Sequence, residues 1–242
     1  MPGAIPVPAR DSARPRTVAV IQARMGSARL PGKVLLPFAG APMLQRIVER
    51  VRRATRVSDI VVATSLAPEN DAVEALCRSI GCRAHRGSES DVLARTLDAA
   101  GDADLVVRLT GDNPFVDGAL VDDLFDFFRA APTDYAANIE NSGFPYGLYA
   151  EIVRTDCLRA AARDGDDEDR EHVTWYVRRR KDAFRLRTMS SDVAYPDMPL
   201  TVDTPEDYRR LEPEFAARFA ADPAFDYRSL ARPPRARTAE KK

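Results

Sequence analysis

The feature that most restricts the fold of this chain is a repeated alternation of two hydrophobic patterns between residues 17 and 111. Short, almost wholly apolar runs such as TVAVIQA and DIVVATS have the pattern of strands covered on both faces. Each is followed by a segment with apolar residues at helical spacing, as in PMLQRIVERVRRAT and ENDAVEALCRSIG. Strands and helices that alternate through short connections form a mostly parallel sheet with helices on both faces. The sequence therefore predicts an α/β fold with a Rossmann-like, mostly parallel sheet.

The remaining elements follow from the same patterns. A helix is expected over SDVLARTLDAAG, a third buried strand over DADLVVRLTGD, and a short strand between Cys82 and Arg86 is left open. Beyond about residue 134 the alternation of strand and helix patterns becomes less regular. Strands near YAANI, LYAEIVR and FRLRTM, with helices near TDCLRAAAR and REHVTWYVRRR, predict a mixed sheet edge and a flap over about residues 134–198. We expect one domain over residues 17–228, a disordered lead-in over 1–16 and a basic, solvated tail over 229–242.

Charge and composition exclude several classes of protein. The 242 residues carry a formal net charge of -1, which gives no indication of a nucleic-acid or membrane-surface partner. No run approaches the roughly 18 apolar residues that span a bilayer, and the first residues lack the apolar core of a secretory signal. Three cysteines without a CxxC pair favour neither a disulfide framework nor a zinc site. We therefore expect a cytoplasmic protein.

A cationic loop follows the first predicted strand. The stretch IQARMGSARLPGK contains Arg24, Arg29 and Lys33 together with Gly26 and Gly32. In an open parallel sheet, ligands bind beyond the carboxyl ends of the strands, which is where this loop lies. Cations and backbone amides gathered in one loop suit a polyanion such as a phosphate chain, although the same composition also fits a solvated surface loop. The spacing matches neither a GxxxxGK[ST] loop nor a GxGxxG fingerprint.

Two aspartates follow apolar runs farther along the chain. In RLTGDNP the third predicted strand ends before Asp112, and in LTVDTPEDY a short apolar strand leads to Asp203. Each motif alone also fits a plain turn, or a helix start capped by Thr204. If both strands join the sheet, the two carboxylates lie beside the cationic loop. They could then share a magnesium ion, which proteins hold with one or two carboxylates besides phosphates and waters.

In this order, five blocks of the sequence resemble those of the cytidylyltransferases that activate acidic sugars: VIQARMGSARLPGKVLLPFAGAPML, RGSESDVLAR, RLTGDNPFVD, REHVTWYVRRR and LTVDTPEDY. The resemblance covers residues 18–211 and points to the branch named for spore-coat polysaccharide biosynthesis protein F, related to the acylneuraminate and keto-deoxy-octulosonate enzymes. It implies a nucleotide-diphospho-sugar transferase (GT-A-like) fold. It also implies a reaction in which an acceptor oxygen attacks the α-phosphate of CTP and releases pyrophosphate, with Mg²⁺ as cofactor. Relatives of this size often pair, so a homodimer could form through the flap.

The resemblance also assigns roles to residues. It implies that the catalytic residues are Arg24, Lys33, Asp112 and Asp203, of which Asp112 and Asp203 hold the metal. It implies CTP contacts from Ala23, Arg24, Gly26, Ser27, Arg29, Lys33, Thr64, Ser65, Arg86, Ser88, Asp91 and Asp112. It implies acceptor contacts from Asn138, Tyr146, Glu151, Arg170 and His172. The loop would hold the β- and γ-phosphates, with Lys33 against the α-phosphate.

The sequence departs from the family pattern where the acceptor would bind. Asn113 stands where this branch usually has cysteine, and Tyr146 and Tyr149 stand where acidic residues are expected, whereas Glu151 is retained. These differences leave the acceptor open, as a sugar acid or as a phosphonate or other acid. His172 could orient an acceptor carboxylate or be a structural histidine at a helix start.

Two other functions stay open from the sequence alone. A glycosyltransferase of this fold would use a DxD-like metal motif, and DGDDEDRE, residues 164–171, offers one, although we expect that segment to be an exposed loop. A scaffold that only binds nucleotides has no need for metal carboxylates. The combination of Lys33, Asp112 and Asp203 therefore favours an enzyme over a scaffold.

Overall fold

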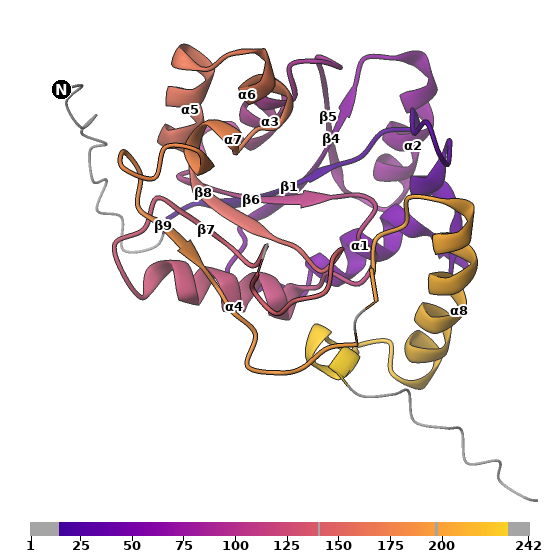
Figure 1. The fold of residues 1–242 in the computed structure, drawn as a ribbon. Helices are drawn as coiled ribbons and strands as arrows, with labels where there is room; N and C mark the ends of the chain where they lie inside the picture. The colour runs from indigo at the N-terminus through magenta and orange to yellow at the C-terminus, as the bar shows by residue number, and fades with distance from the viewer. Residues whose placement is uncertain (1–14, 140, 197, 232–242) are drawn as a thin grey trace, which may run out of the picture.

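The computed structural model describes residues 15–139, 141–196 and 198–231, so the expectations for residues 1–14 and 232–242 lie outside this part of the chain. A seven-stranded sheet forms the centre, in the order β5-β4-β1-β6-β8-β7-β9 (Figure 1). Its strands are β1 (Thr17–Gln22), β4 (Asp59–Ser65), β5 (Arg83–Gly87), β6 (Leu105–Thr110), β7 (Tyr135–Ala137), β8 (Glu151–Arg154) and β9 (Leu186–Thr188). The first four in the order are parallel. β8 is antiparallel to both β6 and β7, and β9 is parallel to β7.

Helices cover both faces of the sheet (Figure 1). They are α1 (Met43–Val51), α2 (Asp71–Ser79), α3 (Val92–Ala100), α4 (Gly118–Arg129), α5 (Thr155–Asp164), α6 (Asp167–Glu171), α7 (Trp175–Arg178) and α8 (Pro205–Ala221). Residues of α1, α2, α4 and α8 share one core, and residues of α3, α5 and α7 share the other. In β1, Ala19 and Ile21 face the first core, whereas Val18 and Val20 face the second. This period-2 division of a fully buried strand confirms the predicted α/β sheet with two covered faces.

Short elements complete the described chain. Three 3-10 helices span Lys33–Leu35, Pro68–Asn70 and Tyr227–Ala231, and a small separate ladder joins β2 (Pro37–Phe38) to β3 (Ala41–Pro42). The strands β7, β8 and β9 extend the main sheet as the predicted mixed edge. Among the described helices, none has the length and apolarity that a membrane crossing requires.

The helix expected over REHVTWYVRRR is wrong as a single element. The chain forms α6 and α7 instead, separated at His172 and Val173. Val173 has a φ of 53°, a conformation that a β-branched residue rarely adopts. Its side chain is fully buried in the second core, and this burial offsets the backbone strain. The break turns His172 toward the carboxyl edge of the sheet, where it lines a cleft described below.

The loop expected over residues 164–171 is also wrong, although most residues of this segment are exposed as predicted. Asp166 and Asp169 form a capping box that begins α6. Asp169 is fully buried and lies 2.5 Å from the guanidinium of Arg179. These carboxylates are therefore structural parts of the short helix.

The strand expected before Asp203 is absent as well. The backbone N–H of Val202 donates to the carbonyl of Asp112 at 2.9 Å, and that of Leu200 donates to the carbonyl of Tyr146 at 2.6 Å. Residues 200–202 therefore cross two loops instead of joining the sheet. We call residues 200–203 the crossing segment.

The structured part of the chain extends beyond the expected bounds at both ends. The carbonyl of Arg16 accepts from the N–H groups of Asp104 and Leu105, next to the start of β6. At the other end, Leu230 is buried in the first core, within the final 3-10 helix. Both residues thus belong to the packed structure and not to a solvated lead-in or tail.

A buried arginine joins three segments beneath this sheet. Arg50 of α1 is 1% exposed and pairs with Asp117 at 3.2 Å. Its guanidinium also donates to the carbonyls of Phe115, Val116 and Phe225. Burial lowers the pKa of Arg50 to about 10, so the group remains charged at neutral pH. The guanidinium therefore donates the hydrogen bonds that water would otherwise supply to these buried backbone carbonyls.

Arg50→Ala is expected to lower the free energy of unfolding by about 3 to 5 kcal/mol, because it leaves the Asp117 carboxylate buried without its cation. Urea unfolding followed by circular dichroism measures the difference. Arg163→Ala, at an exposed position of α5, is the matched control and should change stability by less than about 0.5 kcal/mol. Equal stability of the two variants would contradict the structural role of Arg50.

Candidate active site

A cleft of about 600 Å³ opens beyond the carboxyl ends of β1 and β6. We call it the nucleotide cleft. It is lined by Gln22, Ala23, Arg24, Gly26, Ser27, Ala28, Arg29, Lys33, Val34, Glu89, Ser90, Val92, Arg95, Thr110, Gly111, Asp112, Glu171, His172 and Asp203. The position is the one expected of a ligand site in an open parallel sheet. Most residues of the predicted cationic loop therefore line one cavity with both predicted carboxylates.

At the centre of the cleft, one ammonium group joins the two aspartates. Lys33 Nζ lies 3.0 Å from Asp112 Oδ2 and 2.8 Å from Asp203 Oδ1. Lys33 is only 8% exposed, so these charges interact with little screening by water. Two carboxylates that converge on one cation provide the hard oxygen ligands that Mg²⁺ prefers, with room left for phosphate oxygens. The donor set thus fits a divalent ion shared with a nucleotide.

The loop after β1 owes its shape to backbone contacts. The N–H of Met25 donates to Asn70 Oδ1, and that of Gly32 donates back to the Met25 carbonyl at 2.9 Å. Gly32 has a φ of 72°, which favours glycine, and it precedes the 3-10 turn that carries Lys33. The closed loop directs Lys33 inward to the aspartates.

Other cations surround this centre. Arg29 lies 3.1 Å from Asp203 Oδ2, and Arg24 lies 2.5 Å from Glu89. Arg95 of α3 is 5% exposed and donates to the carbonyl of Ser88. Burial lowers the pKa of Arg95. The cleft therefore presents a set of guanidinium groups to an incoming anion.

A second pocket, of about 360 Å³, adjoins the nucleotide cleft and shares Thr110 and Asp112 with it. We call it the tyrosine pocket. Its lining consists of Arg108, Leu109, Thr110, Asp112, Asn113, Ile139, Tyr146, Gly147, Tyr149, Glu151, Arg178 and Thr201. Asp112 thus stands between a large, highly charged cleft and a smaller pocket, as a site for two reacting molecules requires.

Glu151 lines the tyrosine pocket and is 5% exposed. Its carboxylate is 2.9 Å from Arg108 Nη1 and accepts from the hydroxyl groups of Tyr135 and Thr174. Burial, together with the Glu151 charge, raises the pKa of Tyr135 well above its ordinary value, so this phenol remains a donor. The network fixes Glu151 and Arg108 in place.

Several of the predicted site residues lie outside both linings. Ser65 and Thr64 are fully buried at the end of β4, and Ser88 accepts from the N–H of Asp91. Asp91 caps α3 and pairs with Arg170 at 2.8 Å.

Arg86 and Asn138 also have partners within the fold. Arg86 pairs with Asp71 at 2.5 Å and donates to nearby backbone carbonyls. Asn138 bonds the backbone of Leu148 and Ala150, which holds the connection into β8. The structure therefore gives these side chains structural partners, whereas Tyr146, Glu151 and His172 line cavities.

Sequence reasoning missed Arg95, Arg108 and Arg178 as site residues. Arg95 falls within a predicted amphipathic helix, Arg108 within a predicted buried strand, and Arg178 within a run of arginines that is typical of a solvated surface. A charge in a buried strand was the one available signal, because buried charges need partners.

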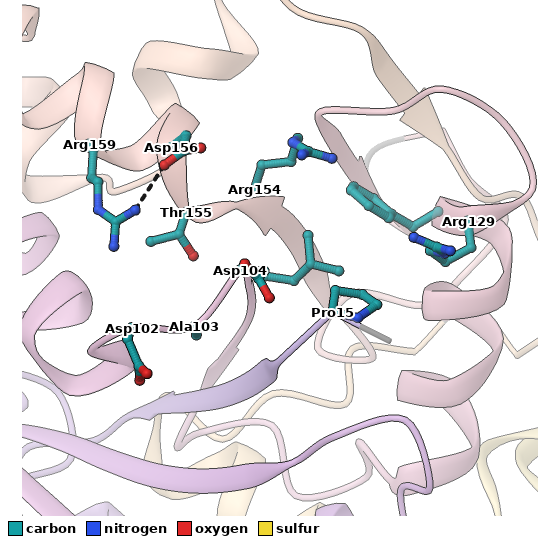
Figure 2. Close-up of a pocket in the computed structure, with 11 residues that line it drawn as sticks. Pro15, Asp102, Ala103, Asp104, Arg129, Arg154, Thr155, Asp156 and Arg159 are labelled. Atoms are coloured by element: carbon teal, nitrogen blue, oxygen red, sulfur yellow. Dashed lines mark hydrogen bonds and ion pairs between the residues drawn. The ribbon is translucent and has the colours of Figure 1, made fainter. Parts of the chain in front are cut away.

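A third hollow, shown in Figure 2, lies at the opposite end of the sheet, near the start of β6 and the end of β8. It measures about 40 Å³, room for a few water molecules. Arginines and aspartates line it together, and Arg159 is joined to Asp156 (Figure 2). Its size makes it unsuited to a nucleotide.

A parallel sheet with a cationic loop and paired carboxylates at its carboxyl edge defines a nucleotide-binding α/β protein. A model of the cytidylyltransferase family matches residues 18–232. The chain is 37% identical over 203 residues to the spore coat polysaccharide biosynthesis protein SpsF of Bacillus subtilis (strain 168), with 80% of this chain and 83% of that protein covered. The chain therefore belongs to the cytidylyltransferase family, as the sequence motifs predicted.

Solved structures agree with this fold. A cytidylyltransferase from Leptospira borgpetersenii serovar Hardjo-bovis (strain JB197) matches with a TM-score of 0.82 and 30% identity, covering 90% of this chain and 92% of that one. A CMP:2-keto-3-deoxy-manno-octonic acid synthetase solved with CTP matches with a TM-score of 0.61 and 24% identity, covering 82% of this chain and 97% of that one. The second likeness concerns the fold alone.

Proposed function

We propose that this chain transfers CMP from CTP to a small acid, with release of pyrophosphate and with Mg²⁺ as the metal. The observation that supports this most is the position of Asp112, Lys33 and Asp203 where the nucleotide cleft and the tyrosine pocket meet. A cleft and an adjoining pocket with charged groups at their junction provide what a transfer between two bound molecules needs. The family supports CTP as the donor.

Different residues of the cleft have different roles in such a transfer. Arg24 and Arg29 bind the outer phosphates, which leave as pyrophosphate. Lys33 lies against the α-phosphate and stabilises the negative charge that grows there. Asp112 and Asp203 would hold a Mg²⁺ ion, which would supply neutralisation of the phosphate charge. Phosphoryl-type transfer depends mainly on positioning and charge stabilisation, so no covalent role for the protein is required.

The base and the acceptor occupy opposite sides of this centre. We infer that the cytosine lies toward residues 89–95, where Glu89 and Arg95 line the cleft. The acceptor lies in the tyrosine pocket, next to Asp112. A relative that is 43% identical over 125 residues is named 3-deoxy-manno-octulosonate cytidylyltransferase 2, and this supports a sugar acid as one candidate acceptor. A cytoplasmic location and a homodimer remain part of the proposal.

Nothing in the described residues favours the glycosyltransferase alternative. The acidic segment that offered a DxD-like motif forms α6, and its Asp166 and Asp169 bind the helix backbone and Arg179. Neither carboxylate lines the nucleotide cleft or the tyrosine pocket. Of residues 164–171, only Glu171 lines the nucleotide cleft, so the aspartates of the DxD-like motif do not reach it.

Thermal unfolding with Mg²⁺ and each of CTP, UTP, ATP and GTP tests the proposal without a known acceptor. A ligand at about 100 times its Kd stabilises the folded state by about 2.7 kcal/mol. For a chain of this size, that corresponds to a rise in Tm of roughly 5 to 10 °C. We expect this rise with CTP and not with the other nucleotides. A rise with UDP-sugars alone would instead support glycosyl transfer, and no rise with any nucleotide would support a scaffold.

A further inference from the structure

Two cysteines stand on either side of the turn that joins α2 to β5, the edge strand of the sheet (Figure 1). Cys77 lies in the last turn of α2, and Cys82 directly precedes β5. Both are free thiols, and neither lines the nucleotide cleft or the tyrosine pocket. The pair therefore has no part in the proposed transfer reaction.

The end of α2 holds the two residues together through its backbone. Cys82 N–H donates to the Cys77 carbonyl at 2.8 Å, and Gly81 N–H donates to the Arg78 carbonyl at 3.3 Å. These bonds, with a φ of 61° at Gly81, form a Schellman motif, whose first and last side chains are often in contact. The 2.8 Å bond keeps the Cα atoms of the two cysteines within at most about 6.7 Å of each other, a separation that a disulfide can span.

The two thiol groups are hydrogen-bonded to each other, and the bond affects them in opposite directions. It raises the pKa of Cys77, and burial of this side chain raises it further. The same bond lowers the pKa of Cys82, and the charge of Arg52 lowers it further, although burial and the charge of Asp59 act the other way. Cys82 is therefore the thiol that loses its proton first, with the Cys77 thiol as hydrogen-bond donor to it.

A pocket of about 280 Å³ gives Cys82 access to small molecules. Arg52 and Arg83 line it with Cys82, and Arg83 pairs with Asp59, another lining residue. The guanidinium of Arg52 is fixed beside the turn because it donates to the carbonyls of the two residues before Cys82, at 2.8 Å each. Cys82 is half-buried in this lining, whereas Cys77 is fully buried.

The third cysteine has none of these features. Cys157 of α5 is fully buried and lines none of the cavities described above. Burial raises the pKa of its thiol to about 12. Because the thiolate and not the thiol is the nucleophile, Cys157 should be inert in the folded protein. It is an internal control for the reactivity of the other two.

We propose that Cys82 is an oxidation site for hydroperoxides and that Cys77 converts its oxidised form to a disulfide. The Cys82 thiolate attacks one oxygen of hydrogen peroxide and the O–O bond breaks, which leaves a sulfenic acid on Cys82. The other oxygen leaves as hydroxide and takes up the proton that Cys82 had released, to form water. The Cys77 sulfur then attacks the Cys82 sulfur, and the sulfenic oxygen leaves with the Cys77 proton as a second water. Two thiols are thus oxidised to one disulfide, and one peroxide is reduced to two waters.

The test maps the thiols of the full chain after exposure to hydrogen peroxide. The protein is reduced, freed of reductant, treated with peroxide, blocked with N-ethylmaleimide in urea and digested with trypsin without reduction. Trypsin cuts after Arg78, between the two cysteines, so a disulfide joins the peptides of residues 57–78 and 79–83. Mass spectrometry measures this joined peptide, which is lighter than the two free peptides together by two hydrogen atoms, and the blocked fraction of Cys157.

We expect the joined peptide from the wild type and, in similar yield, from the control Cys157→Ala. It should be absent from Cys82→Ala and from Cys77→Ala. In Cys77→Ala, dimedone should label Cys82, because the sulfenic acid has no neighbouring thiol to attack it. In the wild type, Cys157 should be oxidised at least about tenfold less than Cys82. The wild-type result does not depend on the stability of any variant.

Three results would overturn the inference. The first is a wild type in which Cys82 stays reduced, or proceeds to sulfinic acid, without any joined peptide. The second is oxidation of Cys157 as readily as Cys82, which would show that the surroundings of Cys82 do not matter. The third is an equal yield of joined peptide when the chain is unfolded in urea before the peroxide step, because the linkage would then follow from the sequence and not from the fold.

Discussion

Asp112→Asn is expected to lower the kcat of CMP transfer at least about a thousandfold, which corresponds to about 4 kcal/mol of lost transition-state stabilisation. The amide keeps the shape of the side chain but removes one of the two carboxylate charges that converge on Lys33. A divalent ion bound there would lose its charged ligand beside the reacting phosphate. Pyrophosphate release at saturating CTP and acceptor measures the change.

The same substitution should leave the fold nearly intact. The crossing segment is bonded to the backbone carbonyl of Asp112, which accepts from Val202 N–H, and these bonds do not use the Asp112 carboxylate. The Tm without ligand should therefore change little, whereas the CTP-dependent rise in Tm should be lost. Asp98→Asn, an exposed carboxylate on α3 outside both cavities, should behave as the wild type. Wild-type turnover by Asp112→Asn would contradict the metal assignment.

The part of the site that follows strands directly could be predicted from the sequence. The loop with Arg24, Arg29 and Lys33 comes immediately after β1, and Asp112 comes two residues after β6. In a parallel sheet the carboxyl ends of neighbouring strands share one edge. Because the loop and Asp112 each follow a strand end closely in the sequence, their positions along the chain were enough to predict that they lie together.

The tyrosine pocket could not be predicted in the same way. Its shape depends on the crossing segment, which reaches Tyr146 and Asp112 by long-range backbone hydrogen bonds instead of a sheet ladder. The turn at Val173, which places His172 in the cleft, depends on burial that overrides the backbone preference of valine. Neither contact leaves a periodic pattern, because each joins segments without regular structure.

Replacing Lys33 is also expected to lower kcat strongly, but Lys33 has a different role from the carboxylates. Lys33→Ala is expected to lower kcat about 100-fold to 1,000-fold, the range found when a single donor to a developing charge is removed. The Kd of CTP should rise less than about tenfold because Arg24, Arg29 and Arg95 still line the cleft. Single-turnover kinetics at saturating substrates, with calorimetric titration of CTP, separate the two quantities.

The effect of Mg²⁺ on the Tm gives an independent test of Lys33→Ala. Without the ammonium group, Asp112 loses its pair with Lys33 and Asp203 keeps only Arg29, so the repulsion between the two carboxylates should lower the Tm of the ligand-free protein. A divalent ion relieves that repulsion and no longer competes with Lys33, so Mg²⁺ should raise the Tm of Lys33→Ala more than that of the wild type. Lys181→Ala, an exposed lysine beyond α7, should show neither effect. Weak CTP binding with normal saturated turnover in Lys33→Ala would refute a role at the α-phosphate, because a group that acts in the transition state must change kcat.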